Sequence, residues 1–172
     1  MKQHYYTKHL MLAALAACAL CTNAAAQTWD GTSAACTKGD GTAENPYLIE
    51  TPQQLAWLSD QVNDGETFEG KHFKLAADLD MGGDQGHTFN KIGVFDKTLD
   101  TSTMQEVDAS KYFKGTLDGD RHIIENLYIN HVDEELGGTG LFACTTDGTV
   151  IRNLIIGSGS TLTGGITSGM FV

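Results

Sequence analysis

Residues 124–129 read Ile-Glu-Asn-Leu-Tyr-Ile, and residues 151–156, which begin 27 positions later, read Ile-Arg-Asn-Leu-Ile-Ile. A second pair, Gly-Leu-Phe at 140–142 and Gly-Met-Phe at 169–171, is offset by 29 residues. A period of about 20 to 50 residues made of short strands and turns indicates a solenoid, a propeller or a parallel β-helix. We therefore expect successive coils of the chain to stack on one another in register.

The repeated asparagine in the first pair leads to a specific expectation. If coils stack at the usual strand spacing of about 4.8 Å, Asn126 and Asn153 lie one above the other. Their side-chain amides can then hydrogen-bond along the stacking axis. The alternative is that each asparagine is a solvated turn residue.

The rest of the chain supports a fold made mostly of strands. Short apolar clusters recur between glycine or aspartate turns, and no helical pattern lies between them, which excludes a doubly wound α/β sheet. The sequence predicts the all-β class. The clusters lie at residues 73–79, 92–95, 112–117, 123–129, 141–142, 150–156 and 166–172.

One helix is expected before these clusters. Residues 51–54 combine an N-cap Thr, a Pro at the first helical position and a Gln at the third, which is a capping box. Leu55, Leu58 and Val62 follow with helical spacing. The sequence predicts a helix at about 52–63, preceded by a short apolar strand.

The first 26 residues have the order of a secretory signal. Two lysines lie in residues 1–9, an apolar run follows at 10–20, and small residues stand at Ala24–Ala26. The run is shorter than the roughly 20 residues that a membrane span needs. We expect cleavage after Ala26 and a secreted or outer-surface location. The alternative is a lipid anchor at Cys18, because Leu15–Cys18 resembles a bacterial lipobox.

Charge excludes some partners. The chain carries a formal net charge of −11, and removal of the signal with its two lysines leaves −13. Such a chain repels nucleic acid phosphates and anionic lipid, so we expect neither as a partner. The length left after cleavage suits one domain, and 41% hydrophobic residues are enough to form a core.

Two cysteines remain after the signal, since Cys18 and Cys21 lie within it. Outside the cell Cys36 and Cys144 can form a disulfide. The alternative is that Cys144, which follows an apolar pair, is a small buried side chain. The sequence leaves the disulfide state open.

Several stretches resemble a known repeat. Residues 113–119 (Phe-Lys-Gly-Thr-Leu-Asp-Gly), 122–127 (His-Ile-Ile-Glu-Asn-Leu) and 140–142 are similar to GLUG-motif repeats of bacterial surface proteins, found also in the N-terminal regions of IgA-protease-like peptidases. Residues 39–81 are similar to the leader of such proteins. The resemblance implies a right-handed parallel β-helix whose open first turn is covered by the helix at 52–63.

The resemblance also sets the expected organisation. It implies a signal peptide at 1–26, an N-terminal cap at 27–70 and an incomplete β-helix at 71–172. Because the second GLUG copy is cut short at Val172, we expect either a fragment of a longer protein or an end covered by another molecule. In the second case the open C-terminal coil makes an end-to-end contact.

The densest polar cluster is Asp118, Asp120 and His122, with Arg121 among them. Residues two apart on a strand share a face, so these side chains can converge as in a carbohydrate-cleaving site. The alternative, which we favour, is a turn at Asp118-Gly119-Asp120 with solvated neighbours. Paired carboxylates for glycoside hydrolysis also need a fixed separation and a cleft, which the sequence does not show.

Metal and peptidase chemistry are not favoured. Asp78, Asp80 and Asp84 suggest a calcium loop, but Gly82 stands at a ligand position of the EF-hand pattern and no Glu follows at the required spacing. We therefore expect a solvated acidic turn. The sequence contains no HExxH zinc motif, nucleophile elbow or phosphate loop. Its scattered histidines after the signal are His72, His87, His122 and His131.

The sequence thus predicts a non-enzymatic protein of the cell surface or exterior that acts in adhesion or binding. We expect no catalytic, metal-binding or cofactor-binding residues, and a ligand such as a glycan or a host surface protein. The alternative is a carbohydrate-active β-helix enzyme, similar to a polysaccharide lyase or hydrolase, or a remnant of one.

Overall fold

The computed structural model describes residues 27–83, 86–131, 138–164 and 167–169, and within them the chain forms one α-helix and thirteen short strands. The helix is α2, Pro52–Asn63. This confirms a strand-dominated fold with a single helix. The strands are β1 Tyr47–Ile49, β2 His72–Leu75, β3 Leu79–Asp80, β4 Lys97–Asp100, β5 Gln105–Asp108, β6 Thr116–Asp118, β7 Ile123–Glu125, β8 Tyr128–Asn130, β9 Gly138–Thr139, β10 Val150–Arg152, β11 Ile155–Ile156, β12 Thr161–Thr163 and β13 Thr167–Ser168.

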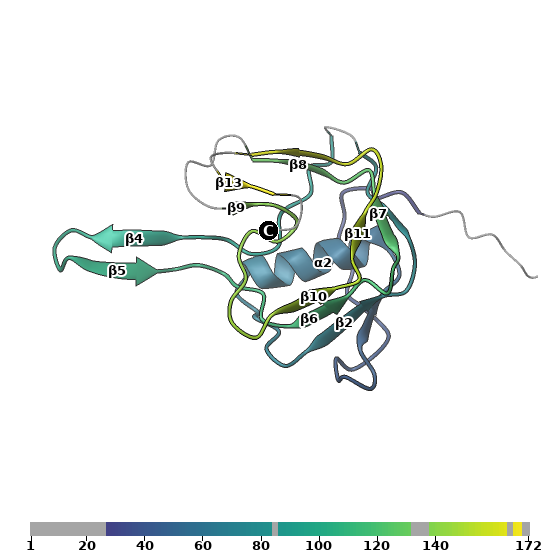
Figure 1. Ribbon diagram of the computed structural model, residues 1–172, viewed down its shortest axis with the longest axis horizontal. Helices are drawn as coiled ribbons and strands as arrows, with labels where there is room; N and C mark the ends of the chain where they lie inside the picture. The colour runs from purple at the N-terminus through teal and green to yellow at the C-terminus, as the bar shows by residue number, and fades with distance from the viewer. Residues whose placement is uncertain (1–26, 84–85, 132–137, 165–166, 170–172) are drawn as a thin grey trace, which may run out of the picture.

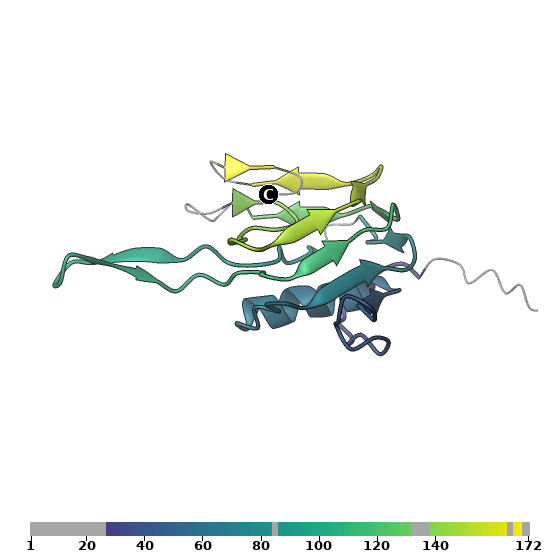
Figure 2. The ribbon, with the colours of Figure 1, turned by 60° about the horizontal axis from the view of Figure 1, so that its bottom comes forward.

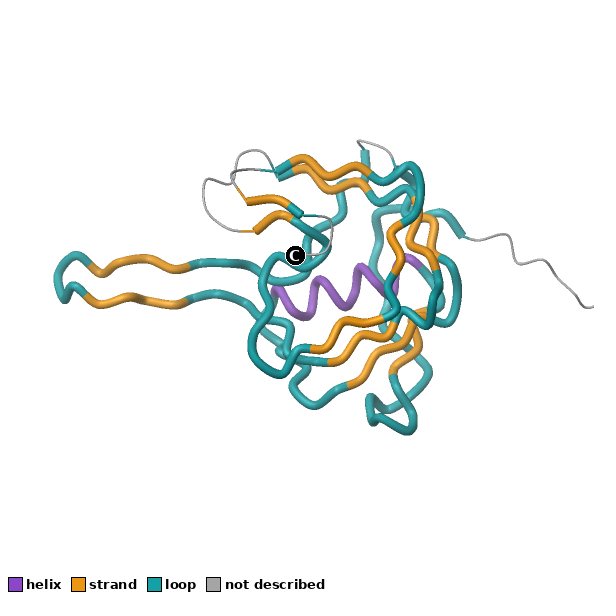
Figure 3. Tube along the Cα trace, viewed as in Figure 1, coloured by secondary structure: helices purple, strands orange, loops and turns teal. Residues whose placement is uncertain are grey.

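Strands that are distant in sequence pair in parallel. The sheets have the orders β1-β2-β6-β10, β11-β7-β3, β12-β8 and β13-β9, and every pair in them is parallel. Figures 1 and 3 show that these sheets follow one another around the molecule. The expectation of parallel pairing between separated segments is therefore confirmed.

The strands lie in successive layers, which are visible from the side in Figure 2. In the four-stranded sheet, Phe73 of β2 is in register with Leu117 of β6, which is in register with Ile151 of β10. Phe73 and Leu117 are almost completely buried. Because side chains alternate along a strand, the residues on either side of them face outward.

Helix α2 lies beneath β2 at one end of these layers (Figure 2) and runs across the space that the strands surround (Figure 1). Its apolar stripe, Leu55, Leu58 and Val62, is completely buried. At its N-terminus Gln54 Oε1 accepts a hydrogen bond from the Thr51 N–H at 3.2 Å, which is the Gln half of the expected capping box. The predicted helix is therefore confirmed at its predicted bounds.

Strands β4 and β5 form an antiparallel hairpin that the sequence did not predict. Figures 1 and 2 show that it projects far from the layered body. The hairpin lies in the interval between β2 and β6, so the register partners Phe73 and Leu117 are 44 residues apart, whereas Leu117 and Ile151 are 34 apart. The number of residues between register partners therefore varies, and the hairpin lies within the longer of the two intervals.

The expected stacking of the two asparagines is wrong. Strand β11 pairs with β7, which places Ile155 beside Ile123, and β10 pairs with β6. Asn126 and Asn153 consequently stand at successive corners of the path, about the length of strand β7 apart. Both have a φ of 53° and follow a strand directly. The 27-residue match therefore reflects two corners of the same type at different places along the path. It does not mark one position that recurs in two successive layers.

The 29-residue match does lie in register over the residues that the structure describes. Strand β13 pairs with β9, and the Gly169 N–H donates to the Thr139 carbonyl at 2.9 Å. Gly169 thus follows β13 as Gly140 follows β9. The expectations for the signal at 1–26, for Asp84 and for the end at Val172 concern residues outside the described ones.

Candidate functional site

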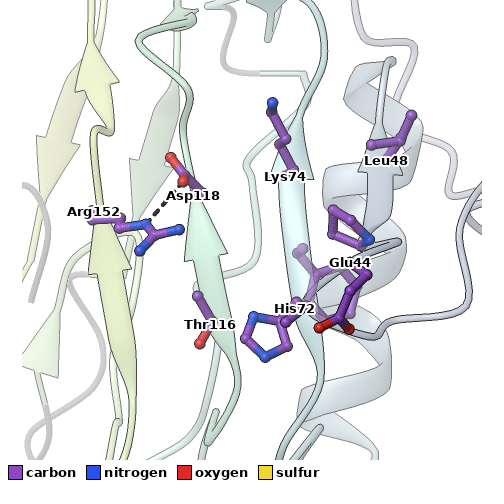
Figure 4. A pocket seen from close by; sticks show the side chains of 10 residues that line it. Glu44, Leu48, His72, Lys74, Thr116, Asp118 and Arg152 are labelled. Carbon is purple, nitrogen blue, oxygen red and sulfur yellow. Dashed lines mark hydrogen bonds and ion pairs between the residues drawn. The ribbon is translucent and has the colours of Figure 1, made fainter.

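A hollow of about 410 Å³ lies on the outer face of the four-stranded sheet (Figure 4). Strands β1, β2, β6 and β10 each contribute to it, and the loop before β1 forms one side. Its lining residues are Ala43, Glu44, Pro46, Leu48, His72, Phe73, Lys74, Thr116, Asp118 and Arg152.

The alternation of strand side chains explains which residues reach the hollow. In β2 the burial alternates along His-Phe-Lys-Leu, with Phe73 and Leu75 buried and His72 and Lys74 partly exposed. The parallel register then brings Lys74 beside Asp118. Outward-facing polar side chains from three strands are thereby collected in one place.

The loop that walls the hollow depends on a glycine. Gly41 has a φ of +79°, and a Cβ at this position would lie 2.4 Å from the ring of Tyr47. The loop can therefore approach β1 only because residue 41 has no side chain. Asp40 fixes the loop further by accepting hydrogen bonds from the N–H and the hydroxyl of Thr42.

Asp118 and Asp120 are paired with donors at the hollow. Arg152 Nε lies 2.8 Å from Asp118 Oδ2, and Asn153 Nδ2 donates to Asp118 Oδ1 at 2.9 Å. At its edge, Lys74 Nζ lies 2.8 Å from Asp120 Oδ2. Burial raises the pKa of Asp118, but the hydrogen bonds from Asn153, from the Asp120 N–H and from Arg152 outweigh it and leave this pKa below its usual value.

Asp118, Asp120 and His122 do not converge, so the less favoured of the two possibilities does not hold. Asp120 and Arg121 have φ values of 46° and 68°, and the Asp120 N–H donates to Asp118 Oδ1. This geometry is a turn, the alternative that the sequence favoured. It sends each side chain to a different partner, and His122 Nδ1 lies 3.0 Å from Asp78 Oδ1.

The two described aspartates of the suspected calcium loop also have separate partners. Asp78 accepts hydrogen bonds from the Ile123 N–H and His122, which lower its pKa. Asp80 accepts one from Asn126 Nδ2 at 2.8 Å, which lowers its pKa against the effect of burial. Among the described residues, no group of three or more His, Cys, Asp or Glu side chains is placed to hold a metal ion.

The structure places His72 and His87 in different surroundings. His72 lines the hollow, while the ring of His87 lies 6.1 Å from that of Trp29. The sequence did not single out Lys74 and Arg152, because only the strand register brings them near Asp118. The one signal for Lys74 was the alternation of polar and apolar residues in β2.

Both described cysteines are free thiols. Cys144 is buried, as in the alternative without a disulfide. Burial raises the pKa of both thiols, and with the charge of Glu50 it raises that of Cys36 to about 11. Neither thiol is therefore activated as a nucleophile.

No family model matches the sequence, and no solved structure matches it significantly. The chain is 29% identical over 119 residues to Halomucin from Haloquadratum walsbyi, which covers 69% of this chain and 1% of that protein. It is 30% identical over 119 residues to a protein of Evansella cellulosilytica named as a Gly-rich membrane protein, which covers 67% of this chain and 11% of that one. The chain thus spans a small part of both relatives.

In the described part of the chain, no helix has the length and apolar character to span a membrane.

Proposed function

We propose that this chain is an exported binding module of the cell surface or exterior, built as a right-handed parallel β-helix of the GLUG-repeat type. The layered parallel strands and the helix at one end of them support this architecture. The signal-like first 26 residues support export. The relative named as a membrane protein is consistent with a place at the cell envelope.

The observation that carries the binding role is the pairing of charges at the hollow. Asp118 is bonded to Arg152 and Asn153, and its lowered pKa keeps it ionised at neutral pH. An ionised, fully paired carboxylate is a poor general acid. The same groups are well suited to recognition, since Arg152, Lys74, His72 and Thr116 present donors and acceptors around a polar cavity.

A binding assay tests this role. Residues 27–172 are passed over immobilised polysaccharides, some neutral and some acidic, and retention is measured. We expect retention on at least one of them and a loss of about tenfold or more in affinity for Arg152→Ala and Lys74→Ala. Lys97→Ala is the matched control, because Lys97 is likewise an ion-paired lysine but lies on the hairpin. Absence of retention, or an equal loss in the control, would refute the role of the hollow.

One observation favours a second candidate, a carbohydrate-active enzyme. Asp118, Arg152, Lys74 and His72 line the same hollow, and carboxylates beside cationic side chains are used in polysaccharide cleavage. The test is release of reducing ends from each polysaccharide in the panel. Turnover that Asp118→Asn abolishes would replace the binding role by an enzymatic one, and intact polysaccharide would support binding alone.

Export has its own test. Intact producing cells are treated with protease, and the N-terminus of the natural protein is determined by mass spectrometry. We expect the protein to be cleaved on intact cells and its N-terminus to be Gln27. A lipid-modified N-terminal Cys18 would instead establish an anchored protein. Resistance to protease on intact cells, together with an uncleaved N-terminus, would contradict export.

A further inference from the structure

The outward side chains of the four-stranded sheet form two rows across the hollow. In one row, Lys74, Asp118 and Arg152 are register partners on β2, β6 and β10. In the other row, His72 of β2 is the register partner of Thr116 of β6. Because neighbouring strands lie about 4.8 Å apart, each row runs along the axis on which the layers stack. A polymer that lies along this axis therefore contacts side chains from more than one layer.

The polar groups at the hollow differ in how they are bonded. Arg152 Nε donates to Asp118 Oδ2 at 2.8 Å, which occupies only one of the three guanidinium nitrogen atoms. The side chains of Glu44, His72 and Thr116 form no hydrogen bond or ion pair with the described residues. Figure 4 shows Glu44 and Arg152 on either side of the hollow, with His72 and Thr116 between them. The hollow thus offers a ligand one free carboxylate, an imidazole, a hydroxyl and the outer nitrogen atoms of a guanidinium.

The charges at the hollow do not favour an anion. Its lining contains two cationic side chains, Lys74 and Arg152, and two carboxylates, Glu44 and Asp118. These four charges cancel, and Asp120, which is paired with Lys74 at the edge, adds a negative one. The chain as a whole carries −11. A polyanion is therefore repelled as it approaches, and inside the hollow it meets a free carboxylate and cations that are already paired.

An uncharged ligand with many hydroxyl groups suits the hollow better than a cation does. A cation would lie beside Arg152, whose side chain is 59% exposed. A hydroxyl group both donates and accepts, so it can bond to Glu44 on one side of the hollow and to Arg152 on the other. Pro46 and Leu48 add apolar surface, against which the C–H groups of a sugar ring can pack.

We propose that the hollow binds a neutral polysaccharide and that Glu44 discriminates against acidic ones. This inference rests on the proposed binding role and specifies the class of ligand. Glu44, Thr116 and Arg152 contact sugar hydroxyl groups, and the bond to Asp118 holds Arg152 in place for this contact. A carboxylate on the sugar would face Glu44 without a free cation to pair with, and this repulsion sets the specificity.

Matched pairs of polysaccharides test the ligand class. Each pair has one backbone in an uncharged and an acidic form: dextran with carboxymethyl dextran, hydroxyethyl cellulose with carboxymethyl cellulose, and fully methyl-esterified with free polygalacturonan. Affinity for residues 27–172 is measured by retardation in native gels that contain the polysaccharide. We expect retardation by the neutral member of at least one pair, and binding of its acidic partner that is weaker by about tenfold or more. The affinity for the neutral member should change little with salt.

The outcomes separate this inference from the binding role on which it rests. If the acidic member of a pair binds as tightly as the neutral one or more tightly, the inference is overturned and the binding role stands. If none of the polysaccharides retards the protein, both are overturned.

Two conservative substitutions test the residues. Thr116→Val keeps the shape of the side chain and removes the hydroxyl, so we expect about threefold to tenfold weaker binding of the neutral member. Glu44→Gln removes the charge, and we expect the preference for the neutral member over the acidic one to fall by at least about threefold. The matched controls are Thr98→Val on the hairpin and Glu125→Gln in another sheet, both at exposed positions.

Circular dichroism should show that all four variants are folded. A preference that Glu44→Gln leaves unchanged would overturn the role of Glu44. Changes in the controls as large as those in the hollow would overturn the assignment of the ligand to this site.

Discussion

Asn153 donates its side-chain amide to the carboxylate of Asp118 in the layer below, at 2.9 Å. Asn126 makes the same bond to Asp80 at 2.8 Å, one corner further along the path. Both asparagines stand in the left-handed region of backbone conformation, where Asn is tolerated better than most residues. At each of these corners the Asn residue therefore has two roles. It adopts the left-handed backbone conformation, and its side chain forms a hydrogen bond to the layer below.

Substitutions at Asn126 should separate these two contributions. Asn126→Ala loses the bond to Asp80 and places an alanine at positive φ, so we expect the free energy of unfolding to fall by about 2–4 kcal/mol. Asn126→Gly loses only the bond and should cost about 1–2 kcal/mol less than the alanine variant. Urea unfolding measures both. Equal losses would show that backbone strain at this corner is unimportant.

Acid should weaken the bonds between layers. The pKa values of Asp80 and Asp118 in the folded protein lie below the ordinary value of about 3.9. A carboxylate whose pKa is lowered by folding stabilises the fold at pH values above the pKa that it has in the unfolded chain. This stabilisation is lost as the pH falls through the pKa that it has in the folded protein. We therefore expect the free energy of unfolding to be nearly constant from about pH 7 to pH 5 and to fall below about pH 4.

The variant Asp118→Asn tests whether titration of Asp118 contributes to this loss of stability in acid. We expect it to lower stability at neutral pH by about 1–2 kcal/mol, and the difference from the unmodified chain to shrink as the pH falls to about 3. Asp147→Asn, in an exposed turn away from these bonds, should lower the stability at neutral pH by less than Asp118→Asn does. If the difference caused by Asp118→Asn is the same at every pH, titration of Asp118 does not contribute to the profile.

The local features of the fold could be predicted from the sequence. The capping residues at 51–54 and the apolar stripe after them located α2, and the Asp-Gly-Asp stretch at 118–120 is the turn that was favoured. These features depend on neighbours in the chain. They need no knowledge of what packs against them.

The register could not be predicted in the same way. The strand-Asn-Leu pattern occurs at 124–127 and at 151–154 because both are corners, and the local sequence does not say which corner. The hairpin was missed because Leu99 and Val107 stand alone among polar residues and form no apolar run. The hollow was missed for a related reason: Lys74, Asp118 and Arg152 come together only through the register.

The hairpin should be dispensable for the fold. Its base is closed by the hydrogen bond from the Ala109 N–H to the Asp96 carbonyl at 2.8 Å, and residues 101–109 are exposed. Replacing residues 97–108 by Gly-Gly should change the free energy of unfolding by less than about 1 kcal/mol, since a shorter loop costs less entropy. Calorimetry measures the change. Loss of the cooperative transition would mean that the hairpin is part of the folding unit.

The two thiols should be free and slow to react. Cys144 is buried, and burial raises the pKa of both Cys36 and Cys144. A thiol reagent at about pH 8 should modify two groups per mature chain, at least tenfold faster in urea than in the folded protein. Cys36→Ser should leave a single reactive group. No reaction in urea without a reductant would instead establish a disulfide between them.

The stacking register is the central claim, and disulfide trapping tests it most directly. Register partners in neighbouring parallel strands lie about 4.8 Å apart, within the Cα range that a disulfide spans. Thr116 and Val150 are such partners. Oxidation of Thr116→Cys, Val150→Cys should therefore yield the new cross-link within one chain, whereas Asn126→Cys, Asn153→Cys should yield none. A cross-link between residues 126 and 153, and none between 116 and 150, would contradict the register and the site built on it.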